Sequence, residues 1–363
     1  MLHTTKNYIT YPKTVANTVK YVLLRLYVET EIYSNSYELV DEMEAVPELN
    51  GQVRFYLQEF LDKRLSYDIP IWLGTAPQNC LQVCKRYKVS YAQVLENSVY
   101  SELVWTEDAN IHFALLGGFS HIDFPYKDLS PVQILPNNKQ FLSTLPYLVM
   151  DLLQQAFVTY MPLADANEVK CVINIRYDDN STATKDIFIG DTFQYQPIMI
   201  PISEAAQGYK LLNPTKKIVQ LSLTIDLQVI DIQVVDNEYL HYLNELHFSN
   251  SLGGFDSIQL TGIAEQSLEA EKQSFEHYLP YNYNLNQRQT NSYNQSQKQS
   301  GKLRSGFLEK SYYEKIIAEL LISKEVFLRI DSNRFLPVNI TTKKMKTLVS
   351  DDFLYSFEFD YTI

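Results

Sequence analysis

The sequence is short of cysteine, and its cysteines are poorly placed for chemistry. The 363 residues include three cysteines, Cys80, Cys84 and Cys171. Because their number is odd and small, a disulfide framework is not expected. Cys80 and Cys84 are spaced like half a metal site, but no second pair of cysteines or histidines stands at a suitable spacing. We therefore expect buried or merely tolerated thiols and folding in a reducing compartment.

Basic residues and long apolar runs are also scarce. The chain has 31 Lys+Arg against 43 Asp+Glu, a formal net charge of −12, and so lacks the basic surface that sequence-specific binding to nucleic acid needs. The N-terminus has no apolar signal core, and the best apolar run, YVLLRLYV, is short and interrupted by Arg25. We expect no membrane span and no export by a signal peptide.

Catalytic patterns are missing as well. The six histidines form no metal-binding motif, and the YDDNS stretch at Tyr177 lacks the spaced carboxylates of a calcium loop. The glycine pairs of the chain are not followed by the Lys-Ser/Thr of a phosphate-binding loop. We therefore expect neither an enzyme nor a bound cofactor.

Alternating apolar and polar residues are abundant, as are the 27 tyrosines and 18 phenylalanines. From Val219 to Val229, VQLSLTIDLQV alternates without an error, which is typical of a strand with one buried face. Short helical patterns occur in FYLQEFLDKRL and PISEAAQGYKL. The sequence predicts a mainly β protein.

Glycine is rare, yet one glycine-containing tetrapeptide occurs twice. Four of the 11 glycines fall in two copies of LGGF, about one domain length apart. The copies are Leu116-Gly117-Gly118-Phe119 and Leu252-Gly253-Gly254-Phe255. Because glycine permits a positive φ and close backbone approach, each pair predicts a sharp bend between strands. We expect Gly253 or Gly254 to have φ > 0 or to lack space for a Cβ atom.

The order of elements before each LGGF is similar: a strand, a polar turn, a strand followed by a short helix, then further strands. We therefore predict two tandem Ig-like β-sandwich domains of related topology, in residues 1–135 and 140–262, with each LGGF at an equivalent bend. Residues 263–363 would form a small α+β, β-barrel-like domain. Within it, the Asn/Gln/Ser-rich arm 282–302 is either a linker or an exposed hairpin, and an amphipathic stripe predicts a helix over about 309–322.

The stretch ELHFSNSLGGFDSIQLTG resembles a recurring segment of predicted tail or baseplate proteins of phages that infect Bacteroidetes-type bacteria. There, a strand runs into N-x-x-G-G-[FW]-D and then into another strand. The matching residues here are Asn250, Gly253, Gly254, Phe255 and Asp256. The resemblance covers roughly residues 140–363 and is weaker in 1–135. There, Ser120 stands at the position that Asp256 occupies in the second copy. It implies a part of a virion or injection machine and gives the motif no catalytic meaning.

Two functions remain open. The first is a structural subunit of a phage tail, baseplate or related ring. It would contact copies of itself and other tail or baseplate proteins. It would be assembled in the host cytoplasm and located in the virion tail. A small barrel flanked by one helix is common in tail tubes and their adaptors, and the C-terminal order of elements is compatible with it. The alternative is a receptor- or glycan-binding module of the same particle, with Trp72 and Trp105 either as stacking platforms or as core or interface residues.

Overall fold

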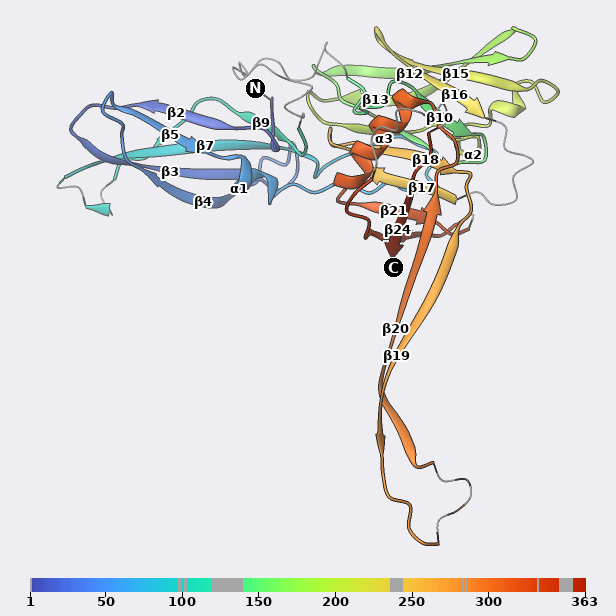
Figure 1. Ribbon diagram of the computed structural model, residues 1–363. Coiled ribbons are helices and arrows are strands. Elements are labelled where there is room, and N and C mark those ends of the chain that lie inside the picture. The colour runs from blue at the N-terminus through green and yellow to red at the C-terminus, as the bar shows by residue number, and fades with distance from the viewer. Residues whose placement is uncertain are drawn as a thin grey trace.

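The computed structural model describes residues 2–96, 99–100, 103–118, 140–235, 244–282, 284, 286, 288–331, 333–345 and 355–363 (Figure 1). It is mainly β, with 50% strand and 8% helix, which confirms the prediction of fold class at this level. Tyrosine, phenylalanine and β-branched residues supply most of the alternating strands, because their side chains pack well on a pleated surface.

The first half of the chain contains a sheet and a smaller strand pair. In sheet order, the strands are β1 (Leu2–Thr4), β9 (His112–Leu115), β7 (Cys84–Leu95), β3 (Val19–Glu29) and β4 (Tyr37–Ala45), and β8 (Thr106–Glu107) also pairs with β7. β1 runs parallel to β9, and the other neighbours are antiparallel. The separate pair is β2 (Thr10–Thr14) with β5 (Gln52–Tyr56), and helix α1 (Gln58–Asp62) follows β5.

The second half repeats this arrangement. Its main sheet has the order β10 (Leu148–Asp151), β16 (Gln228–Val235), β15 (Ile218–Ile225), β12 (Ala166–Tyr177) and β13 (Thr182–Thr192). β10 is parallel to β16, as β1 is to β9. The smaller sheet pairs β11 (Phe157–Tyr160) with β14 (Ile198–Pro201), and β14 also takes β6 (Gln78–Asn79) from the first half. Helix α2 (Glu204–Gln207) and a 3₁₀ turn (Tyr209–Leu211) follow β14. Strand order, direction and helix position therefore match between the halves.

The two LGGF segments nevertheless occupy different places, so the expectation of equivalent bends is wrong. The first directly follows β9, the last strand of the first repeat among the described residues. The second joins β17 (Asn244–Ser249) to β18 (Phe255–Leu260), which come after β16, the strand that corresponds to β9. The two halves therefore repeat in their strand order, but the two LGGF segments do not occupy equivalent positions in the repeat.

The alternating stretch from Val219 to Val229 is also not one strand. A two-residue turn at Asp226 and Leu227 separates β15 from β16, and Asp226 has a φ of +50°. Leu221, Leu223 and Ile225 are fully buried, whereas Leu227 is 95% exposed. The alternation continues through the tight turn, which is why the sequence pattern does not reveal it.

Two more sheets and a helix complete the fold. One sheet has the order β18-β17-β21-β22, with β21 at Val326–Arg329 and β22 at Phe335–Pro337. It joins strands from both sides of the predicted boundary at 262/263, because β17 pairs with β21. The other has the order β19 (Glu265–Glu276), β20 (Thr290–Arg304), β24 (Glu358–Thr362) and β23 (Asn339–Ile340). Helix α3 spans Lys310–Ile322, which confirms the predicted helix to within one residue.

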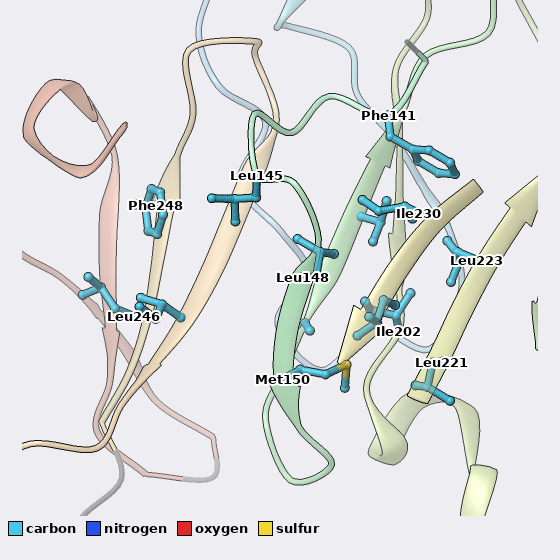
Figure 2. Close-up of a cluster of buried hydrophobic side chains, with 14 of the residues drawn as sticks. Phe141, Leu145, Leu148, Met150, Ile202, Leu221, Leu223, Ile230, Leu246 and Phe248 are labelled. Atoms are coloured by element: carbon cyan, nitrogen blue, oxygen red, sulfur yellow. The ribbon is translucent and has the colours of Figure 1, made fainter. Parts of the chain in front are cut away.

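Buried side chains link these sheets into two large clusters. Figure 2 shows part of one cluster, where Leu246 and Phe248 of β17 lie on the opposite side from Leu221 and Ile230 of the second repeat. The other cluster belongs mainly to the first repeat, but it also includes Phe255 and residues of the second half. Each fully buried aliphatic or aromatic side chain contributes about 1.5–3 kcal/mol relative to exposure, so contacts between the parts stabilise them jointly.

Candidate functional site

The two LGGF segments lie against each other, far apart in sequence but joined in space. The backbone N–H of Gly118 donates to the carbonyl of Ser251 at 2.7 Å. Gly117 has a φ of +132°, and a Cβ atom there would lie 2.3 Å from the same carbonyl oxygen. Gly253 has a φ of +91°, and its Cβ would lie 2.7 Å from the carbonyl oxygen of Leu116. Glycine is required in both copies because two backbones touch, and we call this contact the glycine junction.

Asn250 organises the second half of the glycine junction. Its Oδ1 accepts from the N–H of Leu252 at 3.0 Å and of Gly254 at 2.9 Å. Its Nδ2 donates to the carbonyl of Leu142 at 2.7 Å and to Asp256 Oδ2 at 2.9 Å. Asn250 is 1% exposed, so these four bonds satisfy an amide that burial would otherwise penalise heavily. The N-x-x-G-G-F-D pattern is thus a folded turn held by its first and last polar residues.

Other parts of the chain meet at this turn. Glu319 of α3 accepts from Ser251, through the backbone N–H at 2.7 Å and the hydroxyl at 2.8 Å. Tyr67 donates its hydroxyl proton to the Asn250 carbonyl at 3.0 Å. Leu116, Leu252 and Phe255 are buried around these contacts. Phe119 and Ser120 lie outside the described residues. The predicted bend residues that are described therefore form a structural joint between the first repeat, β17–β18 and α3.

The two tryptophans differ in their surroundings. Trp72 is half-buried and stacks on Phe335, with ring centroids 4.4 Å apart and planes 9° from parallel, and it also contacts Phe327 and His247. Trp105 has one ring face covered by Arg25, whose guanidinium carbon lies 3.8 Å from the ring centroid. Trp72 is therefore part of an aromatic cluster between chain segments, and Trp105 is half of a cation–π pair.

Burial shifts the pKa of several titratable side chains. His3, Tyr87 and His112 form a ring cluster in which burial lowers the pKa of His3 to about 4. All three cysteines are buried and unpaired, and burial raises the pKa of Cys171 to about 12. Within the described part of the chain, no group of three or more His, Cys, Asp or Glu side chains could hold a metal ion. No helix among the same residues is both long and apolar enough to span a bilayer.

The most distinctive surface feature is a long hairpin, β19–β20, which projects from the body (Figure 1). We call residues 265–304 the arm. Every residue of β19 is exposed, and twelve residues at about 3.3 Å each give it a length of roughly 40 Å. At its base, β20 pairs with β24 and Leu303 is 1% exposed, so the arm is anchored in the core.

The far end of the arm carries aromatic side chains. Phe275 and Tyr293 are 50% and 52% exposed with ring centroids 5.9 Å apart, and Phe275 also contacts His277. Tyr278 and Tyr281 follow at the tip and are almost fully exposed. Aromatic residues that cover large area at low entropic cost are typical of contact surfaces.

The sequence predicts only part of the arm. It indicates a linker or an exposed hairpin at 282–302, whereas the structure has a hairpin whose outgoing strand begins at Glu265. The segment EQSLEAEKQSFE has weak strand propensity and no apolar face, so its pattern does not indicate a strand. Composition is the feature of the sequence that could have indicated the whole arm, because the 40 residues from 265 to 304 include few core-forming residues.

No protein-family model matches the chain, and no curated protein sequence does.

Proposed function

We propose that the protein is a structural subunit of a phage tail, baseplate or related ring assembly, and that it acts through subunit contacts. The observation that carries this proposal is the arm. A two-stranded hairpin is at best marginally stable in water by itself, because it buries little surface. An arm about 40 Å long with β19 exposed along its whole length is therefore suited to being completed by another molecule.

The body supports the same proposal as a rigid carrier for the arm. We infer that each repeat is an Ig-like sandwich, because β9-β7-β3-β4 and β16-β15-β12-β13 correspond to the G-F-C-C′ order of an immunoglobulin sheet. The C-terminal sheets with α3 would form a small barrel-like unit at the base of the arm. The glycine junction and the buried Glu319 fix these units to one another, so that a contact made by the arm also positions both sandwiches.

In this function the partners are further copies of the chain in a closed ring and neighbouring tail or baseplate proteins, and the setting is the virion tail. Head-to-tail contacts between identical subunits generate a ring when the rotation closes. The exposed tyrosines of the arm tip would be available for contact with a neighbouring subunit. The alternative, a glycan-binding module, would use exposed aromatic faces, and the faces of Trp72 and Trp105 described above already contact Phe335 and Arg25.

An arm-shortened variant tests the proposal. Ser267 and Ser300 are paired and their Oγ atoms lie 2.8 Å apart, so residues 268–299 can be replaced by Asn-Gly to close a short hairpin. We expect electron microscopy to show rings with a lumen for the full chain and single particles for the variant, at similar melting temperatures. The matched control is Leu227→Asn, which removes a 95% exposed apolar residue from another hairpin and should leave rings intact. A monomeric full chain that binds polysaccharide would contradict the proposal and favour the alternative.

A further inference from the structure

The two strands of the arm differ in charge. β19 carries Glu265, Glu269, Glu271 and Glu276 with a single lysine, whereas β20 carries three basic residues and no carboxylate. The three basic residues are Lys298, Lys302 and Arg304. Lys302 and Arg304 lie where β20 pairs with β24 and form ion pairs with Glu358, so Lys298 is the basic residue on the open part of β20.

The register places these charges in columns. Glu265 lies opposite Lys302, and Glu269 lies opposite Lys298. Because alternate residues of a strand share a face, Glu265, Glu269 and Glu271 line one face of β19. The two lysines line the same face of β20, since directly opposed residues project to the same side of a sheet. One face of the arm thus has an acidic column beside a basic one.

Both edges are open over matching lengths. Among the described residues, β19 pairs only with β20, and β20 pairs with β24 only over Ser300–Arg304. Beyond these pairs, the carbonyl of Gln299 accepts from the N–H of Ile363 at 3.0 Å, so the open part of β20 is 290–298. In the hairpin register this part lies opposite 269–276, since Lys298 pairs with Glu269 and Thr290 with Glu276. The outer arm consequently offers two open edges of equal reach, roughly 30 Å at 3.3 Å per residue.

We propose that the outer arm binds a second copy of this chain edge to edge, with 269–276 of β19 against 290–298 of β20 from its neighbour. This inference rests on the proposed ring and names the contact that would build it. Arms pointing the same way bring β19 and the neighbour's β20 together antiparallel, as within the hairpin. Glu269 then faces Lys298 of the neighbour, whereas pairing two β19 edges would bring glutamates together.

The contact is heterologous, because each copy would use its β19 edge against one neighbour and its β20 edge against the other. Such a contact continues from copy to copy until a ring closes. Polar side chains on the arm would remain in contact with water on the sheet faces, while backbone hydrogen bonds between the copies hold the strands. This accounts for an arm that has few apolar side chains along its length but keeps a strand register with a single irregularity, between Lys272 and Gln273.

Disulfide crosslinking between single-cysteine variants tests the contact. Ala270 lies opposite Gln297 in the hairpin register, and both are exposed, whereas the three native cysteines are buried. Full-length Ala270→Cys protein, carrying a size tag, is mixed with full-length Gln297→Cys protein under assembly conditions and oxidised. We expect a disulfide-linked heterodimer as the main product. The control pair, Ala270→Cys with Asn291→Cys, is out of register by several residues and should link at least tenfold less.

The outcomes separate this inference from the proposed function. An oligomer, seen by light scattering, without the heterodimer overturns the edge-to-edge contact and leaves the ring proposal standing. Preferential linkage of Ala270→Cys to itself also overturns the contact, because it indicates pairing of two β19 edges. A wild-type chain that stays monomeric under assembly conditions overturns both. Rings together with the tagged heterodimer support both.

Discussion

The glycine junction and the arm both rely on polar side chains, but they place them in opposite surroundings. Asn250 is 1% exposed and makes four hydrogen bonds, whereas Asn291 of β20 is exposed on the arm. A buried amide costs free energy unless every bond is made, while an exposed amide exchanges bonds with water. The polar side chains of the junction therefore contribute to the stability of the fold, whereas those of the arm contribute little to it.

The largest effect is expected from Asn250→Ala. The substitution leaves the Leu252 and Gly254 N–H groups and the Leu142 carbonyl without this partner in a buried site. We expect a loss of about 3 kcal/mol in the free energy of unfolding, measured by urea denaturation. Asn291→Ala is the matched control and should change stability by less than about 0.5 kcal/mol. Equal effects of the two substitutions would remove the distinction between junction and arm.

A smaller effect is expected from Gly253→Ala, about 1–3 kcal/mol of destabilisation. The added Cβ would meet the Leu116 carbonyl oxygen at 2.7 Å in addition to the strain of a φ of +91°. Gly190 is a close control, since its φ is +93° but the nearest atom to its Cβ would lie 3.9 Å away. Gly190→Ala should therefore show the strain without the clash, and calorimetry of both variants separates the two causes. If Gly190→Ala were as costly, close approach of the LGGF segments would contribute nothing.

A third prediction concerns pH at another buried polar cluster. Burial, and then the neighbouring His112, lowers the pKa of His3 from 6.5 to about 4. Because the unfolded chain then binds more protons than the folded one, His3 reduces stability as pH falls from about 6.5 towards 4. We expect His3→Gln to lose less stability than the wild type over this range, measured by urea midpoints at each pH. His277→Gln on the arm is the control, and an unchanged pH profile for His3→Gln would contradict the prediction.

The smallest effect on stability is expected at the arm tip. Phe275→Ser with Tyr293→Ser removes two half-exposed rings that contact each other outside the core. We expect the free energy of unfolding to change by less than about 0.5 kcal/mol, while the oligomeric fraction at fixed concentration falls. Thermal unfolding and analytical ultracentrifugation measure the two quantities. A large drop in melting temperature would show that the tip stabilises the subunit itself.

The sequence predicted elements whose pattern is local and missed those that depend on distant contacts. Helix α3 was located to within one residue because its apolar stripe has helical spacing over several turns. The turn at Asp226 was missed because a two-residue hairpin preserves alternation. The need for glycine at 253 was predicted, but its cause was not, since nothing in the spacing of LGGF indicates that Leu116 lies beside it. Within the candidate site, the Asn/Gln/Ser-rich composition predicted part of the arm, but β19 was missed because its sequence lacks the alternation of a strand.

The anchoring of the arm has a mechanical consequence. β20 runs as a single strand from the outer arm into the core, where five of its residues, from Ser300 to Arg304, pair with the antiparallel strand β24. A force along the arm would load these pairs in shear, so that their hydrogen bonds resist together rather than opening one at a time. The strand would thus transmit tension from the tip of the arm to the sheet beside α3 with little extension.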